Sequence, residues 1–343
     1  MSGDGAHPDS RHQIVWTRRR VLHDGVTVAG IGMLAACGCA PSVGQRPKVP
    51  TVGFVSPVPP DLEQFLRPFR ALGYVEGQTV TIASRTAVQE TAEQLTPVVE
   101  ELVRLPADVI VAVGSTAAGV AKGATKTIPV AFFGVADAIA LGLVTSVARP
   151  EGNVTGLTNI SAQAIGKGLE YLLQLAPGIA RVAFVGNLTG NPGSLLQLAA
   201  ARASAKTIGV QIVDFALRDP ADIDPVFESF SNSGVKAVMV GSDAITISSR
   251  QHLVDIAARY RLPTIYARRE FADAGGLIAY GPSYPALWER LAVLVDKMVR
   301  GRAPGDLPVE EPTRFDLVVN SKTAQALGIT VPQPILVQAE VVH

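Results

Sequence analysis

Two sets of residues in this sequence could bind charged groups of opposite sign. Gly114, Ser115 and Thr116 follow an apolar run and lead into a segment of helical pattern. The free N–H groups at such a helix start, with two hydroxyls beside them, could receive a carboxylate. Asp137 and Asp243 also follow apolar runs, and either could hold an ammonium group by charge-assisted hydrogen bonds. Together these residues predict a polar binding site with two complementary ends.

Further candidates occupy the same kind of position, directly after an apolar run. In an open parallel sheet, ligands bind outside the carboxyl ends of the strands, so such positions are candidates for contact with a ligand. The further candidates are Ser56, Pro57, Asn187 and Glu270. Arg268 and Arg269 precede Glu270 and could line the same cleft, although a solvated charge run is an alternative for at least one of them. Tyr280 and Tyr284 could stack on a ligand or pack a hinge.

Each candidate also has an ordinary structural interpretation. Ser115 and Thr116 could only cap a helix, as hydroxyl residues often do. Asp137 could cap the segment that follows it, and Asn187 and Asp243 could shape turns. The sequence leaves both interpretations open.

Catalytic signatures are absent from the sequence. There is no G-x-S-x-G elbow, and the histidine nearest to mid-chain, His252, falls in a helical pattern without a nucleophile beside it. "GSTAAG" at 114–119 is not G-x-G-x-x-G, and no Walker sequence occurs. No cluster of His and carboxylates suggests a metal site. We therefore predict a binding protein without cofactor or metal, with a small-molecule enzyme on the same fold as the less favoured alternative.

Both cysteines lie in "MLAACGCAP" at 33–41. A disulfide between Cys37 and Cys39 would close a very tight ring, and a zinc site would need about four ligands, for which partners at workable spacing are missing. Upstream stand three arginines at 18–20 and a short apolar run that ends in small residues, which is typical of an export signal. "TRRRVL" is similar to a twin-arginine signal, and "LAAC" is similar to a bacterial lipobox.

These patterns predict an export signal over residues 1–36 and a tether over 37–48, with a lipid on Cys37 as the anchor. The expected place is the periplasm or another extracytoplasmic compartment, at the membrane. An ordinary cleaved signal and a buried N-terminal helix are the alternatives. The apolar run is far shorter than the roughly 20 residues of a membrane-spanning helix.

Length and composition indicate a folded chain of two domains. The 343 residues exceed the roughly 250–300 at which a single core usually divides, and 48% of them are apolar. The 30 basic and 30 acidic residues balance, without a basic patch or a charged tail. Nucleic acid is therefore not an expected partner.

Short apolar runs alternate with longer segments of helical period along the chain. Most runs, such as those at 109–114 and 181–186, lack alternation, as strands buried on both faces do. Strand–helix repeats predict parallel sheets with helices on both faces. Glycine- and proline-rich joints at 148–159, 275–285 and 303–313 suggest that the chain crosses between two lobes. We expect an α/β fold of two doubly wound lobes joined by a hinge.

Several motifs, in order and at matching spacing, resemble the ABC transporter substrate-binding family that includes tryptophan/tyrosine-type components. They cover residues 49 to 342 and are "LGYVEGQTVTI", "ELVRLPADVIVAVGSTAA", "TIPVAFFGVADAIALGLVTSVARPEGNVTGLT", "RLPTIYARREFADAGGLIAYGPSYP" and "LPVEEPTRFDLVVNSKTAQALGI". Two departures concern the ligand: Ala136 and Ala138 flank Asp137 where relatives often have glycine and proline, and Gly186 stands where many have an aromatic. An aromatic amino acid as ligand is thereby put in doubt.

The resemblance implies a periplasmic-binding-protein fold of type I with three crossovers. The corresponding division is 49–156 and 281–306 for one lobe, and 157–280 and 307–343 for the other. It further implies a monomer that captures a small solute, such as an amino acid or related carboxylate, and delivers it to an ABC permease. A ligand-sensing lipoprotein that serves a membrane receptor is the alternative.

Overall fold

The computed structural model describes residues 48–59, 61–87, 90–159 and 162–343. The predicted export signal and nearly all of the predicted tether, including Cys37 and Cys39, lie outside the described residues. Within the described residues, no helix is both long and apolar enough to cross a membrane.

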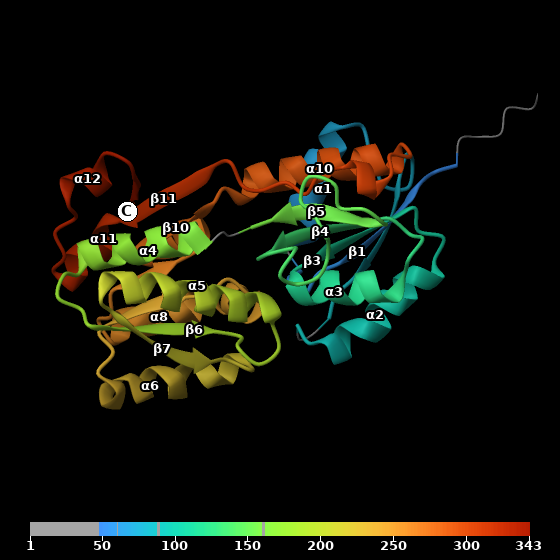
Figure 1. The fold of residues 1–343 in the computed structure, drawn as a ribbon. Helices are drawn as coiled ribbons and strands as arrows, with labels where there is room; N and C mark the ends of the chain where they lie inside the picture. Colours follow the sequence, from blue (N-terminus) through green and yellow to red (C-terminus); the bar gives the residue numbers. More distant parts are fainter. Residues whose placement is uncertain (1–47, 60, 88–89, 160–161) are drawn as a thin grey trace, which may run out of the picture. The chain divides into compact units, whose positions relative to one another are not determined.

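The first sheet is entirely parallel and has the strand order β2-β1-β3-β4-β5 (Figure 1). Its central strand β3 is a run of Val, Ile and Ala in which all five residues are buried, as the absence of alternation predicts. The strands are β1 (Thr51–Val55), β2 (Thr81–Arg85), β3 (Val109–Val113), β4 (Val130–Val135) and β5 (Val154–Thr158).

Helices cover both faces of the first sheet (Figure 1). On one face, α1 (Asp61–Ala71) and α10 (Tyr284–Val299) bury a cluster rich in aromatic side chains, in which Phe133 stacks on Trp288 at a ring distance of 3.7 Å. On the other face lie α2 (Ala92–Arg104) and α3 (Ser115–Ala124), whose small alanines fit closely against the strands. We call this sheet with its four helices the first lobe.

The second sheet has seven strands in the order β12-β11-β10-β9-β8-β6-β7. All neighbours are parallel except β10 and β11, which pair antiparallel because the chain returns from the first lobe between them. The strands are β6 (Arg181–Gly186), β7 (Gln211–Ala216), β8 (Ala237–Val240), β9 (Thr264–Tyr266), β10 (Ile278–Pro282), β11 (Phe315–Asn320) and β12 (Glu340–Val342).

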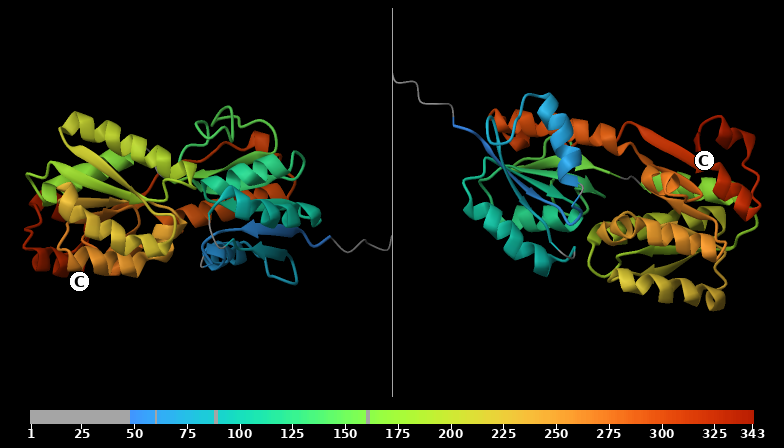
Figure 2. Two further views of the ribbon diagram at one scale, coloured as in Figure 1. Left: turned by 90° about the horizontal axis from the view of Figure 1, so that it is seen from below. Right: turned by 180° about the vertical axis from the view of Figure 1, so that it is seen from behind.

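Two layers of helices enclose the second sheet, and together they form the second lobe (Figure 2). One layer contains α4 (Ala162–Leu175), α5 (Pro192–Ile208), α11 (Ser321–Leu327) and α12 (Gln333–Leu336). The other contains α6 (Ile223–Ser233), α7 (Ala244–Ser248), α8 (Arg250–Arg259) and α9 (Arg269–Asp273). Helix α5 stops at Gly209, which takes the left-handed conformation with φ 82° that glycine adopts without strain.

Three segments connect the lobes. The chain leaves the first sheet after β5, returns from β10 into α10, and passes from α10 to β11 through the 3₁₀ turn Pro304–Asp306. The last connection lies against β5: the Thr155 hydroxyl donates to the Leu307 carbonyl at 2.7 Å, and Glu310 forms a bridge with Leu157. Arg290 of α10 holds Glu310 by a two-pronged ion pair.

The observed pairing confirms the predicted α/β class with two mostly parallel sheets, each between helices. The first crossover follows Thr158, because β5 pairs with β4 up to that residue, two residues later than the predicted boundary at 156. The exact division of the chain between the lobes remains a prediction.

Candidate functional site

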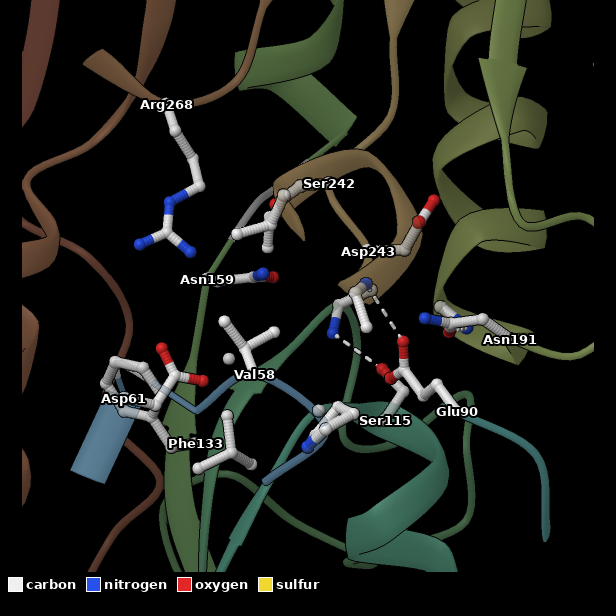
Figure 3. A pocket seen from close by; sticks show the side chains of 18 of the residues that line it. Val58, Asp61, Glu90, Ser115, Phe133, Asn159, Asn191, Ser242, Asp243 and Arg268 are labelled. Atoms are coloured by element: carbon white, nitrogen blue, oxygen red, sulfur yellow. Dashed lines mark hydrogen bonds between the residues drawn. The ribbon is translucent and has the colours of Figure 1, made fainter. Parts of the chain in front are cut away.

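A cavity lies at the carboxyl ends of strands from both sheets (Figure 3). Its volume, counted as space open to the centre of a water-sized sphere, is about 50 Å³. The first lobe contributes residues that follow β1, β3, β4 and β5, and the second lobe contributes residues that follow β8 and β9 and the start of α5. This is the position expected of a ligand site in open parallel sheets.

The structure brings four of the predicted site residues to this cavity: Pro57, Gly114, Ser115 and Asp243. Three others, Ser56, Thr116 and Asn187, are buried behind them and do not line it. Glu270 stands behind Arg268, and Asp137 lies elsewhere.

Ser56 positions an acidic group at the cavity wall. Its hydroxyl donates to Asp61 Oδ2 at 2.7 Å, and Asp61, the first residue of α1, lines the cavity. Burial raises the pKa of Asp61, although the hydrogen bond from Ser56 opposes this. Ser56 therefore acts through Asp61.

Glu90 occupies the space beside the start of α3. Its Oε1 lies 2.6 Å from the point that a Cβ would take at Gly114, a residue whose φ of +93° also suits glycine alone. Burial, and then the charge of Asp243, raise the pKa of Glu90 to about 8. The helix start that we predicted for a ligand carboxylate thus has a carboxyl group of the protein itself against it.

Asp243 both lines the cavity and stabilises the local fold through hydrogen bonds. It caps α7 in a capping box with Thr246, and its Oδ2 accepts from the Asn187 backbone N–H at 2.8 Å and from Ser194. Burial raises its pKa, against these hydrogen bonds. Asn187 in turn accepts from the Gly190 N–H and shapes the turn after β6, which is the ordinary interpretation of that residue.

Asp137 lies outside the cavity. It is exposed, and its Oδ1 accepts from the backbone N–H groups of Ile139 and Ala140, both at 2.9 Å. It lines a wider, open hollow with residues of α4 and α5 instead. The prediction that Asp137 contacts the same ligand as Ser115 and Asp243 finds no support in this arrangement, because the chain turns away after β4.

Arg268 supplies a buried positive charge. Its side chain is 7% exposed, its guanidinium lies 3.8 Å from the centre of the Tyr284 ring, and one of its N–H groups donates to Glu270 Oε1 at 3.2 Å. Burial opposes ionisation of Glu270, but the charge of Arg268 and the hydrogen bonds to the carboxylate together outweigh it and keep the Glu270 pKa below its usual value. Tyr284 lines the cavity and begins α10, so it belongs both to the site and to a crossover.

Asn159 follows β5 and is 5% exposed. Its Nδ2 donates to the Tyr284 hydroxyl at 3.3 Å, whereas its Oδ1 has no hydrogen-bond partner among the described residues. Figure 3 shows this amide in the middle of the lining side chains.

The lobes touch each other beside the cavity. The Ala244 N–H of the second lobe donates to Glu90 Oε2 at 3.1 Å, and the Thr116 hydroxyl of the first lobe reaches the Gly190 carbonyl at 3.4 Å. Gly193 of α5 approaches so closely that an added Cβ would lie 2.5 Å from Ser115 Oγ. These contacts join the lobes beside the cavity.

Sequence reasoning did not select Asp61, Glu90, Asn159 and Asn191. Asn159 directly follows β5, but the sequence of that strand, "VTGLT", is not a continuous apolar run and lies in a joint that we interpreted as a connection. Asp61 and Glu90 stand several residues beyond their strands, and only the path of the intervening loops brings them to the cavity. No group of three or more His, Cys, Asp and Glu suited to a metal ion occurs in the described part of the chain.

The sequence of residues 63–343 matches the family described as ABC transporter substrate binding protein. The chain belongs to this family. Its members are substrate-binding proteins, which agrees with a site built for binding rather than catalysis.

Among its relatives is the tyrosine-binding protein of Clostridioides difficile, 24% identical over 265 residues that span 77% of this chain and 75% of that protein. Two solved structures, each 24% identical and matched over 86% of this chain and all of the other, share the fold. One is a conserved domain protein from Vibrio cholerae, with a TM-score of 0.79, and the other is an ABC domain from Streptococcus pneumoniae in complex with L-Trp, with a TM-score of 0.75. Their fold confirms the predicted two-lobed periplasmic-binding-protein type.

Proposed function

We propose that this protein captures a small amino acid or a related carboxylate between its lobes and delivers it to an ABC permease for import. The observation that carries the proposal is the cavity itself. It combines a buried arginine, three carboxyl groups and an unpaired amide oxygen at the carboxyl ends of facing strands. Such a set suits a solute that has both a positive and a negative group.

The relatives support the amino acid class. One is named for tyrosine and another is solved with L-Trp. The cavity of this chain favours a smaller solute, because an apolar cavity of about 150 Å³ is what benzene occupies, and this one measures about 50 Å³.

Of the residues predicted from sequence, we propose Pro57, Gly114, Ser115 and Asp243 as parts of the binding site. Asp61, Glu90, Asn159 and Arg268 join them. Ser56, Thr116, Asn187 and Glu270 support these residues from behind.

The expected mechanism is closure of one lobe on the other. A solute that contacts both lobes favours the closed arrangement by the difference between its affinities for the closed and open forms. Closure removes water from Arg268 and the carboxyl groups, which strengthens their contacts with the solute. The closed protein, acting as a monomer, then docks on the permease.

A thermal-shift screen of residues 48–343 with amino acids and small carboxylates tests this function. Binding to the folded state raises the melting temperature by mass action. Mass spectrometry of solute retained through purification would identify the class directly. Chemical turnover of a stabilising compound, or no stabilisation by any compound of these classes, would contradict the proposal.

We also propose that the protein is exported and anchored by lipid on Cys37. The support is the sequence pattern at 17–37 and the extracytoplasmic role of the family. One acyl chain gives only marginal membrane binding, so more than one is expected. Mass spectrometry of the protein from native membranes should show a modified N-terminal Cys37, and an unmodified Cys37 would refute the anchor.

A further inference from the structure

Asn159 presents the cavity with an acceptor that the protein leaves unused. The side chain is buried, and its Nδ2 is engaged by the Tyr284 hydroxyl, which turns Oδ1 toward the cavity. A buried amide oxygen without a partner destabilises the folded state, and native structures rarely leave one unpaired. A donor on the bound solute would remove this cost.

The carboxyl groups around the cavity also favour a cationic solute. Asp61, Glu90 and Asp243 line it, whereas the lining arginine, Arg268, already faces Glu270 at 3.2 Å. Burial disfavours the charged form of all three lining carboxyl groups and raises their pKa, and a nearby positive charge would oppose this effect. A positive group on the solute would supply the balancing charge.

The start of α3, where the sequence predicts binding of a ligand carboxylate, is not available to the anionic end of a solute. Glu90 Oε1 lies against Gly114 there, so a second carboxylate would meet a space that a carboxyl group of the protein already fills. Arg268 is the cationic side chain that lines the cavity, and its planar guanidinium can serve a carboxylate as well as Glu270.

We propose that this site accepts only solutes with a protonated amine, that Asn159 Oδ1 receives an N–H of this amine, and that Arg268 receives the carboxylate. Simple carboxylates without an amine are rejected, because they leave Asn159 Oδ1 unpaired and add negative charge to an acidic cavity. This inference rests on the proposed function and narrows its ligand class.

The test compares matched compounds by titration calorimetry and thermal shift on residues 48–343. Each stabilising amino acid is paired with the acid that lacks its amine: alanine with propionate, valine with isovalerate, and tyrosine with 3-(4-hydroxyphenyl)propionate. We expect the amino acid to bind at least about 10-fold more tightly than its deamino partner. Equal binding by a deamino acid would overturn the inference and leave the proposed function in place. Failure of both members of every pair to bind would overturn both.

Two substitutions at Asn159 distinguish direct contact with the solute from a role in holding Tyr284 in place. Asn159→Leu removes the acceptor, and Asn159→Asp keeps an acceptor of the same shape. Both lose the Nδ2 donor to the Tyr284 hydroxyl, although the new carboxylate can accept a hydrogen bond from that hydroxyl. We expect Asn159→Leu to weaken amino acid binding by about 10-fold or more and Asn159→Asp to retain it. Asn232→Ala, on the exposed side of α6, is the control.

Equal losses in both variants would show that Asn159 only supports Tyr284, and would overturn its assignment. Stronger binding of a deamino acid by the wild type than by Asn159→Leu would indicate that Nδ2, not Oδ1, faces the solute, and would overturn it as well.

Discussion

Glu90 is a buried carboxyl group whose surroundings resist its ionisation. It lies against Gly114, accepts from the Ala244 N–H and faces Asp243, and its pKa rises to about 8. Since its pKa in the unfolded chain is near the ordinary 4.5, the folded state binds a proton more tightly. The stability that this proton contributes is fully present below about pH 4.5 and is lost as the pH rises through about 8.

Glu90→Gln should therefore flatten the dependence of stability on pH. An amide can still accept from Ala244 and carries no charge at any pH. Between about pH 5 and pH 9, we expect the wild type to lose on the order of a few kcal/mol relative to the variant, measured by urea unfolding. Glu93→Gln, on an exposed glutamate of the next helix, is the control. Parallel pH profiles of wild type and Glu90→Gln would refute the burial argument.

Asp137 and Asp243, which the sequence presents as equivalent, should differ on substitution. Asp243→Ala removes a helix cap and leaves the buried N–H of Asn187 unpaired, so the free energy of unfolding should fall by about 2–4 kcal/mol. Asp137→Ala removes an exposed turn cap and should cost about 1 kcal/mol or less without changing solute affinity. Denaturant unfolding and calorimetry measure the two effects. Loss of solute binding in Asp137→Ala would show that Asp137 belongs to the binding site after all.

Among the helices and strands, the approach of α5 to α3 limits how the lobes close. Gly193→Ala would place a methyl 2.5 Å from Ser115 Oγ and hold the lobes apart. We expect solute affinity to fall by about 10-fold or more, while the free energy of unfolding changes by less than about 1 kcal/mol, because alanine is a better helix former than glycine.

The matched control for that substitution is Gly119→Ala in α3, where nothing lies within 4 Å of the added Cβ. It should raise stability by about 0.5–1 kcal/mol and leave affinity unchanged. If both variants bind as the wild type does, the contact between α5 and α3 has no role in closure.

The strands that the sequence predicts well are those buried on both faces, such as β3 and β6, since their apolar runs are continuous. β2 lacks this signal because it is an edge strand with a partly exposed, polar sequence, "TIASR". β12 is likewise a short edge strand of partly exposed residues. Edge strands are specified by pairing with a neighbour, which composition does not reveal.

At the scale of the whole molecule, contacts between the lobes are few and polar beside the cavity, whereas each lobe has its own large cores. Opening would expose little apolar surface. We therefore predict that solute lowers the radius of gyration in small-angle scattering, because it shifts the population toward the closed arrangement. Gly193→Ala should retain the larger radius at solute concentrations that close the wild type. An unchanged radius on saturation would contradict closure by lobe rotation.

The class of fold and the two parallel sheets could be predicted from the sequence, and so could the strand ends at which the cavity lies. Periodicity and the strand-end rule depend on neighbours along the chain, so they identify Pro57, Ser115 and Asp243. Only the tertiary structure decided which groups meet. Loop paths bring Glu90 to the start of α3 and turn Asp137 away from the cavity, and packing on Tyr284 leaves Asn159 Oδ1 unpaired. Those contacts join residues far apart in the chain, so the local sequence pattern cannot predict them.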